Sequence, residues 1–424
     1  MLKKHLGKER LMFFFFALIT LIKMSKSYII FIRIRWSDNM KAKVGSSILK
    51  DSFDAGVETA QIAISGLKNP KIGFLFTSVK YNQNEVLKGI KSVNPDLNVI
   101  GMTSNESIMT PDGIISSPNG FAGMLVLEDN EMKISVAGSE RGANPRDTGR
   151  MIAEEALEKS GKKYSPSSFA MFASPKEEEE YLKGIQDVLG DIPMFGGAAN
   201  DDAAIGQWSV LCNDESYKSG CAIALFYSTK EIKTIFSHDY KATNNVGIIN
   251  KIEDGYKIMQ IDGEPALKKY AEWNDMNPDE LMGQNLMINS IKYPLGFKTI
   301  QGECISVKHP IMGYPDYSFT IDSLVTDKIA TIGLETDIDE LIGGSAKSIR
   351  KIKANMTPAA FLLIHNSFRK KYIGERIDED FVAIKNSIGD IPFIVTFSFK
   401  EFGEYNHSGA MVNGLSLSYT GFSK

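Results

Sequence analysis

The sequence predicts an α+β fold, a layered α/β arrangement in which helices pack on mixed β-sheets. Apolar strands and amphipathic helices alternate along the chain, and several strands follow one another with no helix between them. The composition agrees, because 43% hydrophobic and 24% charged residues are typical of a globular protein. A length of 424 residues favours two or three domains.

One strand–helix–strand unit occurs three times, and repeats of this kind define an architecture. In the first copy, strands over residues 72–78 and 99–104 flank a helix. The helix carries apolar residues at a spacing that places them on one face. These residues, in the three copies, are Val86, Leu87, Ile90 and Val93; Leu182, Ile185 and Leu189; and Phe381, Ile384 and Ile388. The later copies begin with strands over 169–173 and 361–364, and both continue after the helix with Gly-Asp-Ile-Pro.

Each copy then supplies a later apolar strand, predicted over residues 121–127, 221–227 and 411–419. The second half also contains a divergent unit, with two strands around the turn Asp254-Gly255. There Asp262-Gly263 leads into a helix with Pro265 near its first turn. We therefore predict an N-terminal extension (1–39), an N-terminal domain (40–238) and a C-terminal domain (239–424).

The N-terminal extension differs from the rest of the chain in charge. It contains eight Lys or Arg residues against Glu9 and Asp38, which gives +6, so a total of -4 leaves -10 for residues 40–424. Its apolar run, residues 11–22, is shorter than the about 20 residues that a spanning helix needs. Three interpretations stay open: a start assigned too early, with Met40 as the true start; a membrane anchor that includes 11–34; and a degenerate signal peptide.

Several function classes are disfavoured. An acidic body does not suit nucleic-acid binding, which depends on Lys and Arg. Three cysteines cannot form a disulfide framework and favour a reducing, cytoplasmic location. The five histidines have no metal-ligand spacing, and no catalytic motif is recognisable, so we expect no metal, cofactor or enzymatic activity. We interpret the acidic run 177–180 as helix capping, with Ser174 as the cap, Pro175 at the first position and Glu177 reaching back.

The most informative segment follows the second strand of the second copy. Paired glycines, Gly196 and Gly197, allow close backbone approach, and small residues leave room above them. Asn200, Asp201 and Asp202 then offer hydrogen-bond acceptors at a strand end, where ligand sites often lie. The alternative is a tight turn in which these side chains cap their own backbone.

Residues 192–202, Ile-Pro-Met-Phe-Gly-Gly-Ala-Ala-Asn-Asp-Asp, resemble the hallmark of the FIST domain family. The resemblance continues through residues 261–266 and Tyr293-Pro294-Leu295, which are similar to the start of the family's C-terminal domain. It differs in places. Ser104 and Asn105 stand where the family has a Gly-Glu pair. Lys400-Glu401 stands where a second such pair is expected, so only its glutamate is retained, and a cysteine-to-arginine motif retains only Arg369.

The resemblance implies a sensory domain of signal transduction that binds small ligands such as amino acids. With no output module recognisable, we expect a stand-alone sensor acting on a partner in trans. Glu401 and Arg369 would pair with the ammonium and carboxylate of an α-amino acid, with Asp201 or Asp202 as alternative ammonium partners. The predicted ligand-binding residues are Gly196, Gly197, Asn200, Asp201, Asp202, Ser104, Asn105, Arg369 and Glu401. The alternatives are a protein-interaction scaffold and an enzyme that uses Asp201, Asp202 and Glu401 as acid and base.

Overall fold

The structure is a computed structural model that describes residues 39–203, 205–298, 305–404 and 409–424. The predicted extension, residues 1–39, lies outside this described part except for Asn39. The predicted α+β fold is confirmed, because mixed sheets alternate with helices throughout. No helix among the described residues is both long and apolar enough to cross a bilayer.

The repeat predicted from sequence is part of a larger unit that occurs three times. Each unit has the order strand, helix, strand, helix, strand, hairpin, strand. The first comprises β1 (Lys41–Ser47), α2 (Ser52–Ile64), β2 (Pro70–Thr77), α3 (Gln83–Val93), β3 (Asn98–Thr103), the hairpin β4 (Ile108–Thr110) and β5 (Gly113–Ile115), and β6 (Ala122–Glu128). The second comprises β7 (Lys133–Glu140), α4 (Pro145–Ser160), β8 (Ser168–Ala173), α5 (Glu178–Leu189), β9 (Met194–Ala198), the hairpin β10 (Val210–Cys212) and β11 (Glu215–Tyr217), and β12 (Gly220–Tyr227).

The third unit contains a long insertion after its first strand. It comprises β13 (Ile232–Ser237), α8 (Ile338–Asn355), β22 (Pro358–Asn366), α9 (Ser367–Ile373), α10 (Ile377–Ile388), β23 (Phe393–Ser398), the hairpin β24 (Glu401–Glu404) and β25 (Ala410–Asn413), and β26 (Leu417–Ser423). The single strand predicted over 411–419 is therefore wrong. Residues 414–416 separate β25 from β26, and these two strands belong to different sheets.

Each unit donates its hairpin to the sheet of another unit. β10 of the second unit pairs with β3 of the first, through Val210 opposite Met102. β24 of the third unit pairs with β9 of the second, and β4 of the first pairs with β23 of the third. The exchange is cyclic and makes three six-stranded sheets of the same design. The predicted boundary at 238/239 falls between β13 and β14, and two of the three sheets contain strands from both sides of it.

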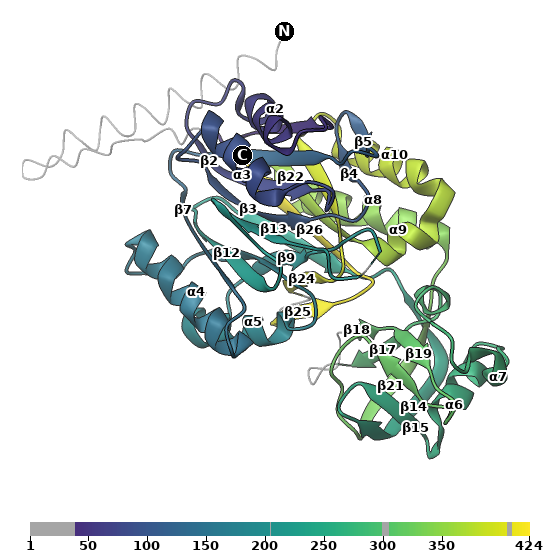
Figure 1. Cartoon of the computed structure of the whole chain (residues 1–424). Helices are drawn as coiled ribbons and strands as arrows, with labels where there is room; N and C mark the ends of the chain where they lie inside the picture. Colours follow the sequence, from purple (N-terminus) through teal and green to yellow (C-terminus); the bar gives the residue numbers. More distant parts are fainter. Residues whose placement is uncertain (1–38, 204, 299–304, 405–408) are drawn as a thin grey trace, which may run out of the picture. The chain divides into compact units, whose positions relative to one another are not determined.

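The three sheets share a core of aromatic and aliphatic side chains. Phe74 of β2, Phe195 of β9 and Phe422 of β26 each come from a different unit, and their ring centroids lie 5.7–6.1 Å apart. All three are at most 1% exposed. Helices cover the outer faces: α4 and α5 lie together against the sheet of β7, β12 and β8 (Figure 1). The core therefore joins all three units rather than one half of the chain.

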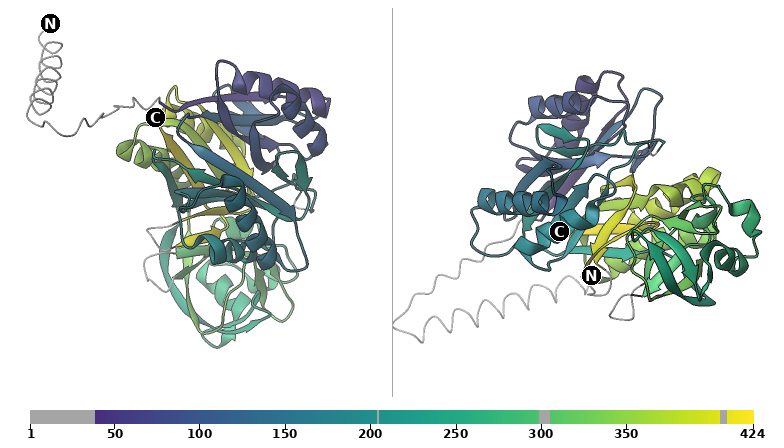
Figure 2. Two further views of the ribbon diagram at one scale, coloured as in Figure 1. Left: turned by 90° about the vertical axis from the view of Figure 1, so that its left-hand side faces the viewer. Right: turned by 60° about the horizontal axis from the view of Figure 1, so that its bottom comes forward.

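The insertion between β13 and α8 forms a fourth sheet, visible as a separate green group in Figures 1 and 2. Its elements are β14 (Lys241–Glu253), β15 (Lys257–Ile261), β16 (Glu264–Pro265), α6 (Ala266–Trp273), α7 (Pro278–Leu281), β17 (Leu295–Lys298), β18 (Ile305–Lys308), β19 (Pro310–Gly313), β20 (Phe319–Ile321) and β21 (Ile329–Glu335). The predicted turn Asp254-Gly255 joins β14 and β15, and both residues have positive φ. The predicted helix after Pro265 is α6.

The capping prediction for the acidic run is wrong. Helix α5 begins at Glu178, and Glu177, the N-cap residue directly before it, makes no capping hydrogen bond through its side chain. The hydroxyl of Ser174 instead accepts the N–H of Gly220, 3.0 Å away on β12. This pairing keeps Ser174 on the sheet, and Lys176 turns the chain into the helix with a left-handed φ of 92°.

Candidate functional site

The ends of β3, β9 and β23 meet at the centre of the three units. Backbone hydrogen bonds join them in a cycle: Asn105 N–H donates to Phe397 O, Asn200 N–H to Thr103 O, and Phe399 N–H to Ala198 O. All three donor–acceptor distances are 3.0–3.1 Å. Because the segments after the three strands hold one another, most of the predicted site residues come together here. We call this region the strand-end centre.

The paired glycines at this centre allow close packing. A Cβ on Gly196 would lie 1.8 Å from the carbonyl oxygen of Met171 on the neighbouring strand, and its φ of 152° suits glycine. A Cβ on Gly197 would lie 2.8 Å from Ile364 of the third unit. These glycines therefore bring two backbones and two units into contact.

The polar side chains after β9 form hydrogen bonds with other groups of the same chain. Asp201 is 1% exposed and accepts the N–H groups of Ala203, Ile205 and Gln207 at 2.7–3.1 Å. Asn200 donates to the hydroxyl of Ser367 at 2.7 Å. The carboxylate of Asp201 therefore holds its own loop in place, which agrees with the interpretation of this segment as a tight turn. Asn200 instead joins the second unit to the third.

The predicted residues of the first unit complete this network. Ser104 donates to Ser107 O and accepts the N–H of Phe397. Asn105 donates to Asp201 O at 2.9 Å, and Asp202 accepts the N–H of Glu106 at 2.8 Å. These hydrogen bonds therefore run in both directions between the first and second units, and each of these side chains already has a partner within the protein.

Glu401 lies at the same centre and is 0% exposed. Its carboxyl oxygens accept from Ser398 at 2.5 Å, from Asn366 at 3.0 and 3.2 Å and from the N–H of Ser416 at 3.0 Å. Burial raises the pKa of Glu401 to about 8, and these donors oppose the rise. At neutral pH the group is therefore largely protonated, which leaves it no charge to offer an ammonium.

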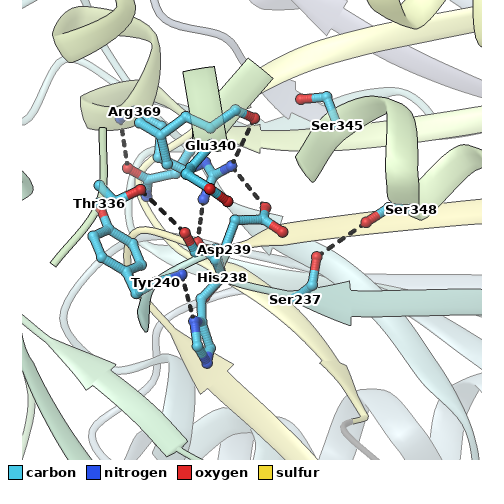
Figure 3. A network of polar contacts seen from close by, with 12 residues as sticks. Ser237, His238, Asp239, Tyr240, Thr336, Glu340, Ser345, Ser348 and Arg369 are labelled. Atoms are coloured by element: carbon cyan, nitrogen blue, oxygen red, sulfur yellow. Dashed lines mark hydrogen bonds and ion pairs between the residues drawn. The ribbon is translucent and has the colours of Figure 1, made fainter. Parts of the chain in front are cut away.

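Arg369 is 0% exposed and belongs to a separate network (Figure 3). Its Nη2 forms an ion pair with Asp239 at 3.0 Å, and its Nη1 donates to His238 O. Nε has no hydrogen-bond partner within the described residues. The predicted cation is therefore neutralised by Asp239, a residue that the sequence did not indicate. Burial also lowers the pKa of His238 to about 4, so this imidazole is neutral.

A cavity of about 390 Å³ opens beside the strand-end centre, at Lys400. The N-terminal turn of α5 forms one wall, and Tyr256, Ser323 and Leu324 of the inserted sheet form the other. Lys400 is 4% exposed, and its Nζ lies 3.6 Å from Oε2 of Glu178. This distance is too long for a hydrogen bond, so the two charges face each other with their hydrogen-bonding capacity unused by this contact.

The cavity contains further unsatisfied polar atoms. Oε1 of Glu178 and Oγ of Ser323 are buried and have no hydrogen-bond partner within the described part of the chain. Burial raises the pKa of Glu178, and Lys400 opposes that rise. Burial also disfavours the charge on Lys400, but Glu178, Asp322 and Glu179 outweigh it and raise the lysine pKa. Buried polar groups without partners are costly and often mark a ligand site.

The charges around this cavity balance. Lys176 and Lys400 line it, and Lys308 lies behind Glu179 with 3.9 Å between Nζ and Oε1. Against these three lysines, of which Lys308 has its pKa lowered by burial, stand Glu178, Glu179 and Asp322. Glu177 and Glu180 pair with Arg141 and Lys183. A neutral zwitterion would keep this balance.

Sequence reasoning missed Glu178 and Lys400 as a pair. Two signals existed: the acidic run 177–180, and a lysine directly before the predicted Glu401. They were not connected because their segments are more than 200 residues apart in the chain. No group of three or more His, Cys, Asp or Glu side chains suited to a metal occurs among the described residues.

Residues 71–264 match the model of the FIST N domain. FIST domains are sensory domains of signal-transduction proteins, so this match supports a sensory role. No curated protein matches the chain. Among solved structures, the chain is similar to a cyanuric acid hydrolase from A. caulinodans, with 9% identity over 91% of this chain and 100% of that chain and a TM-score of 0.32. It is also similar to PurLQS from Thermotoga maritima, with 8% identity over 92% of this chain and 74% of that chain and a TM-score of 0.24. Similarity at this level says nothing about activity.

Proposed function

We propose that this chain is a sensory protein that binds an α-amino acid in the cavity at Lys400 and acts on an output partner in trans. Residues 239–424 would then supply the C-terminal FIST half, and the protein would work in the cytoplasm. The FIST N match supports the sensory role, and the cavity supports the ligand class. The carrying observation is the Lys400–Glu178 pair, buried in a charge-balanced cavity and separated by 3.6 Å.

The pair matches the two charged groups of an α-amino acid. Lys400 would bind the carboxylate, helped by the N-terminal backbone N–H groups of α5, where anions are favoured. The unsatisfied Oε1 of Glu178 would accept from the ammonium, and Ser323 would add a hydroxyl. Tyr256 and Leu324 would contact the side chain of the ligand. A cavity of this volume lies within the usual range of about 300–1,000 Å³ for small-molecule sites.

Binding is favoured over catalysis because the candidate catalytic carboxylates already accept hydrogen bonds from the protein. The oxygens of Asp201 and Glu401 accept hydrogen bonds from the protein, and an oxygen of Asp202 accepts the N–H of Glu106. A general base must instead reach a proton on the substrate.

A thermal-shift screen of the full chain against the common α-amino acids tests the proposal. A ligand at about one hundred times its dissociation constant adds about 2.7 kcal/mol of stability. The double variant Lys400→Met/Glu178→Gln removes both charges together and should abolish the shift. The matched control is Lys88→Met/Glu85→Gln, which removes an exposed ion pair on α3. Helix α3 occupies the position in the first unit that α5 occupies in the second. If no amino acid raises the melting temperature, or if the double variant retains the shift, the proposal fails and a scaffold role gains support.

A further inference from the structure

A second cavity, of about 670 Å³, lies along β13 next to the Arg369 network. The start of β9, with Phe195, forms one wall, and α8 forms another. The segment Ser237–Tyr240, which Figure 3 shows beside Arg369, also lines it. No residue of the cavity at Lys400 lines this one.

This second cavity has an excess of positive charge. Lys347 and Lys351 lie one turn apart on α8, and neither side chain forms an ion pair or hydrogen bond with a described residue. Lys233 of β13 is the third lysine, with its Nζ 3.8 Å from Glu231. Of the acidic lining residues, Asp239 is neutralised by Arg369, which leaves Glu231 and Glu404 against three lysines. Lysines at helical spacing act as point charges toward a phosphate.

Hydroxyl groups line the remainder of the cavity. Oγ of Ser168 is buried, with the residue 3% exposed, and has no hydrogen-bond partner among the described residues. Ser237 and Ser348 pair with each other at 3.1 Å, and each hydroxyl can still take part in another hydrogen bond. Buried hydroxyls without partners suit a ligand that carries hydroxyl groups of its own.

We propose that this cavity binds a phosphate monoester up to the size of a mononucleotide. Its phosphate would lie between Lys347 and Lys351, and its sugar hydroxyls would bind Ser168, Ser237 and Ser348. The volume falls within the range for such ligands. Because His238 and Asp239 both line the cavity and hold Arg369, an occupant would contact the segment that positions this arginine.

Isothermal titration of the full chain with AMP, glucose 6-phosphate and inorganic phosphate tests the proposal. AMP or glucose 6-phosphate should bind saturably and weaken as salt rises, since the phosphate contacts are electrostatic. Adenosine should bind at least tenfold more weakly than AMP. The variant Lys347→Gln/Lys351→Gln alters two exposed residues, so folding should be preserved, and it should weaken binding at least tenfold.

The matched control is Lys163→Gln/Lys218→Gln, which makes the same change in net charge on exposed lysines outside the cavity. It should bind AMP as the wild type does, and so should Lys400→Met/Glu178→Gln, because the two cavities are separate. Absence of saturable binding of either phosphate ester would overturn the proposal. Binding that the Lys347/Lys351 variant retains, or that the control loses equally, would also overturn it.

Discussion

Lys400 and Glu178 face each other at 3.6 Å in a cavity, although one follows β23 of the third unit and the other begins α5 of the second. Their encounter depends on the exchange of hairpins, because β24 pairs with β9 and so carries Lys400 to the second unit. The fold thereby builds a charge pair that neither unit contains alone. Buried charges without good hydrogen bonds add little stability, which favours a functional reason for their presence.

The first prediction concerns the cost of breaking this pair. Lys400→Met leaves Glu178 buried without its cation and should destabilise the protein by about 3–5 kcal/mol at pH 7. The double variant Lys400→Met/Glu178→Gln should recover most of this loss. Urea unfolding of the two singles and the double forms a complete cycle. Strictly additive losses would show that the two side chains do not interact.

The second prediction concerns pH. The pKa of Glu401 is raised from 4.5 to about 8, so the folded state holds this proton more tightly than the unfolded state. Its contribution to stability is complete below pH 4.5 and falls by about 1.4 kcal/mol per pH unit as pH rises toward 8. Glu401→Gln should remove this fall. Unfolding free energies of variant and wild type between pH 5 and 9 measure it, and parallel curves would refute the assignment.

The third prediction concerns Arg369. Arg369→Met leaves Asp239 largely buried without its partner and should cost about 3–5 kcal/mol. Arg369→Lys should also destabilise, because an ammonium cannot reach His238 O and Asp239 with the geometry of a guanidinium. Arg376→Met is the control: this arginine is 40% exposed and its ion pairs are screened by solvent, so its loss should cost far less than that of Arg369. Thermal unfolding compares the three, and equal losses would contradict the ranking.

The fourth prediction concerns Gly196. In Gly196→Ala, the new Cβ would meet the carbonyl of Met171 at 1.8 Å, so the strand must shift, at a cost above about 3 kcal/mol. Gly66→Ala is the matched control: Gly66 also has a positive φ, of 82°, but no atom lies within 4 Å of its Cβ position. It should cost only about 1–2 kcal/mol of backbone strain. A small loss in Gly196→Ala would mean that this close approach is not required.

The fifth prediction concerns division of the chain between residues 238 and 239. A fragment 40–238 lacks β24, which pairs with β9, and the strands that pair with β13 and β4, while a fragment 239–424 lacks β13 and β4–β5. Neither should fold alone, whereas the two expressed together should associate. Circular dichroism and size exclusion measure both outcomes. A cooperative unfolding transition in an isolated fragment would contradict the role assigned to the exchanged hairpins.

The sequence predicted the features that depend on neighbouring residues. The strand from Ile72 and the helix with Val86, Leu87 and Ile90 are local patterns, and the structure contains both. The hairpin exchange was not predictable. β4 and β24 are only three and four residues long, and their partners lie hundreds of residues away. For strands this short, the pairing is decided by tertiary packing rather than by propensity.

The same limit applies to the site. Asp201 was predicted to follow the end of a strand, and it lies after β9, but its partner Gln207 could be identified only in three dimensions. The same holds for Asn366, the partner of Glu401. The family resemblance predicted a ligand-binding role for Arg369, and nothing in the sequence indicated that Asp239 lies against it. Lys400 shows the opposite error: it lines the candidate cavity, but the sequence indicated no role for it and singled it out only as the neighbour of Glu401.

The central claim is that Lys400 and Glu178 together bind a zwitterion. Isothermal titration of the full chain with the best amino acid of the screen, its des-amino acid and its decarboxylated amine tests this claim most directly. The account predicts that the amino acid binds, and that each analogue binds at least tenfold more weakly because one charge loses its partner. Equal binding of the amino acid and its des-amino analogue, or no binding of any amino acid, would contradict it.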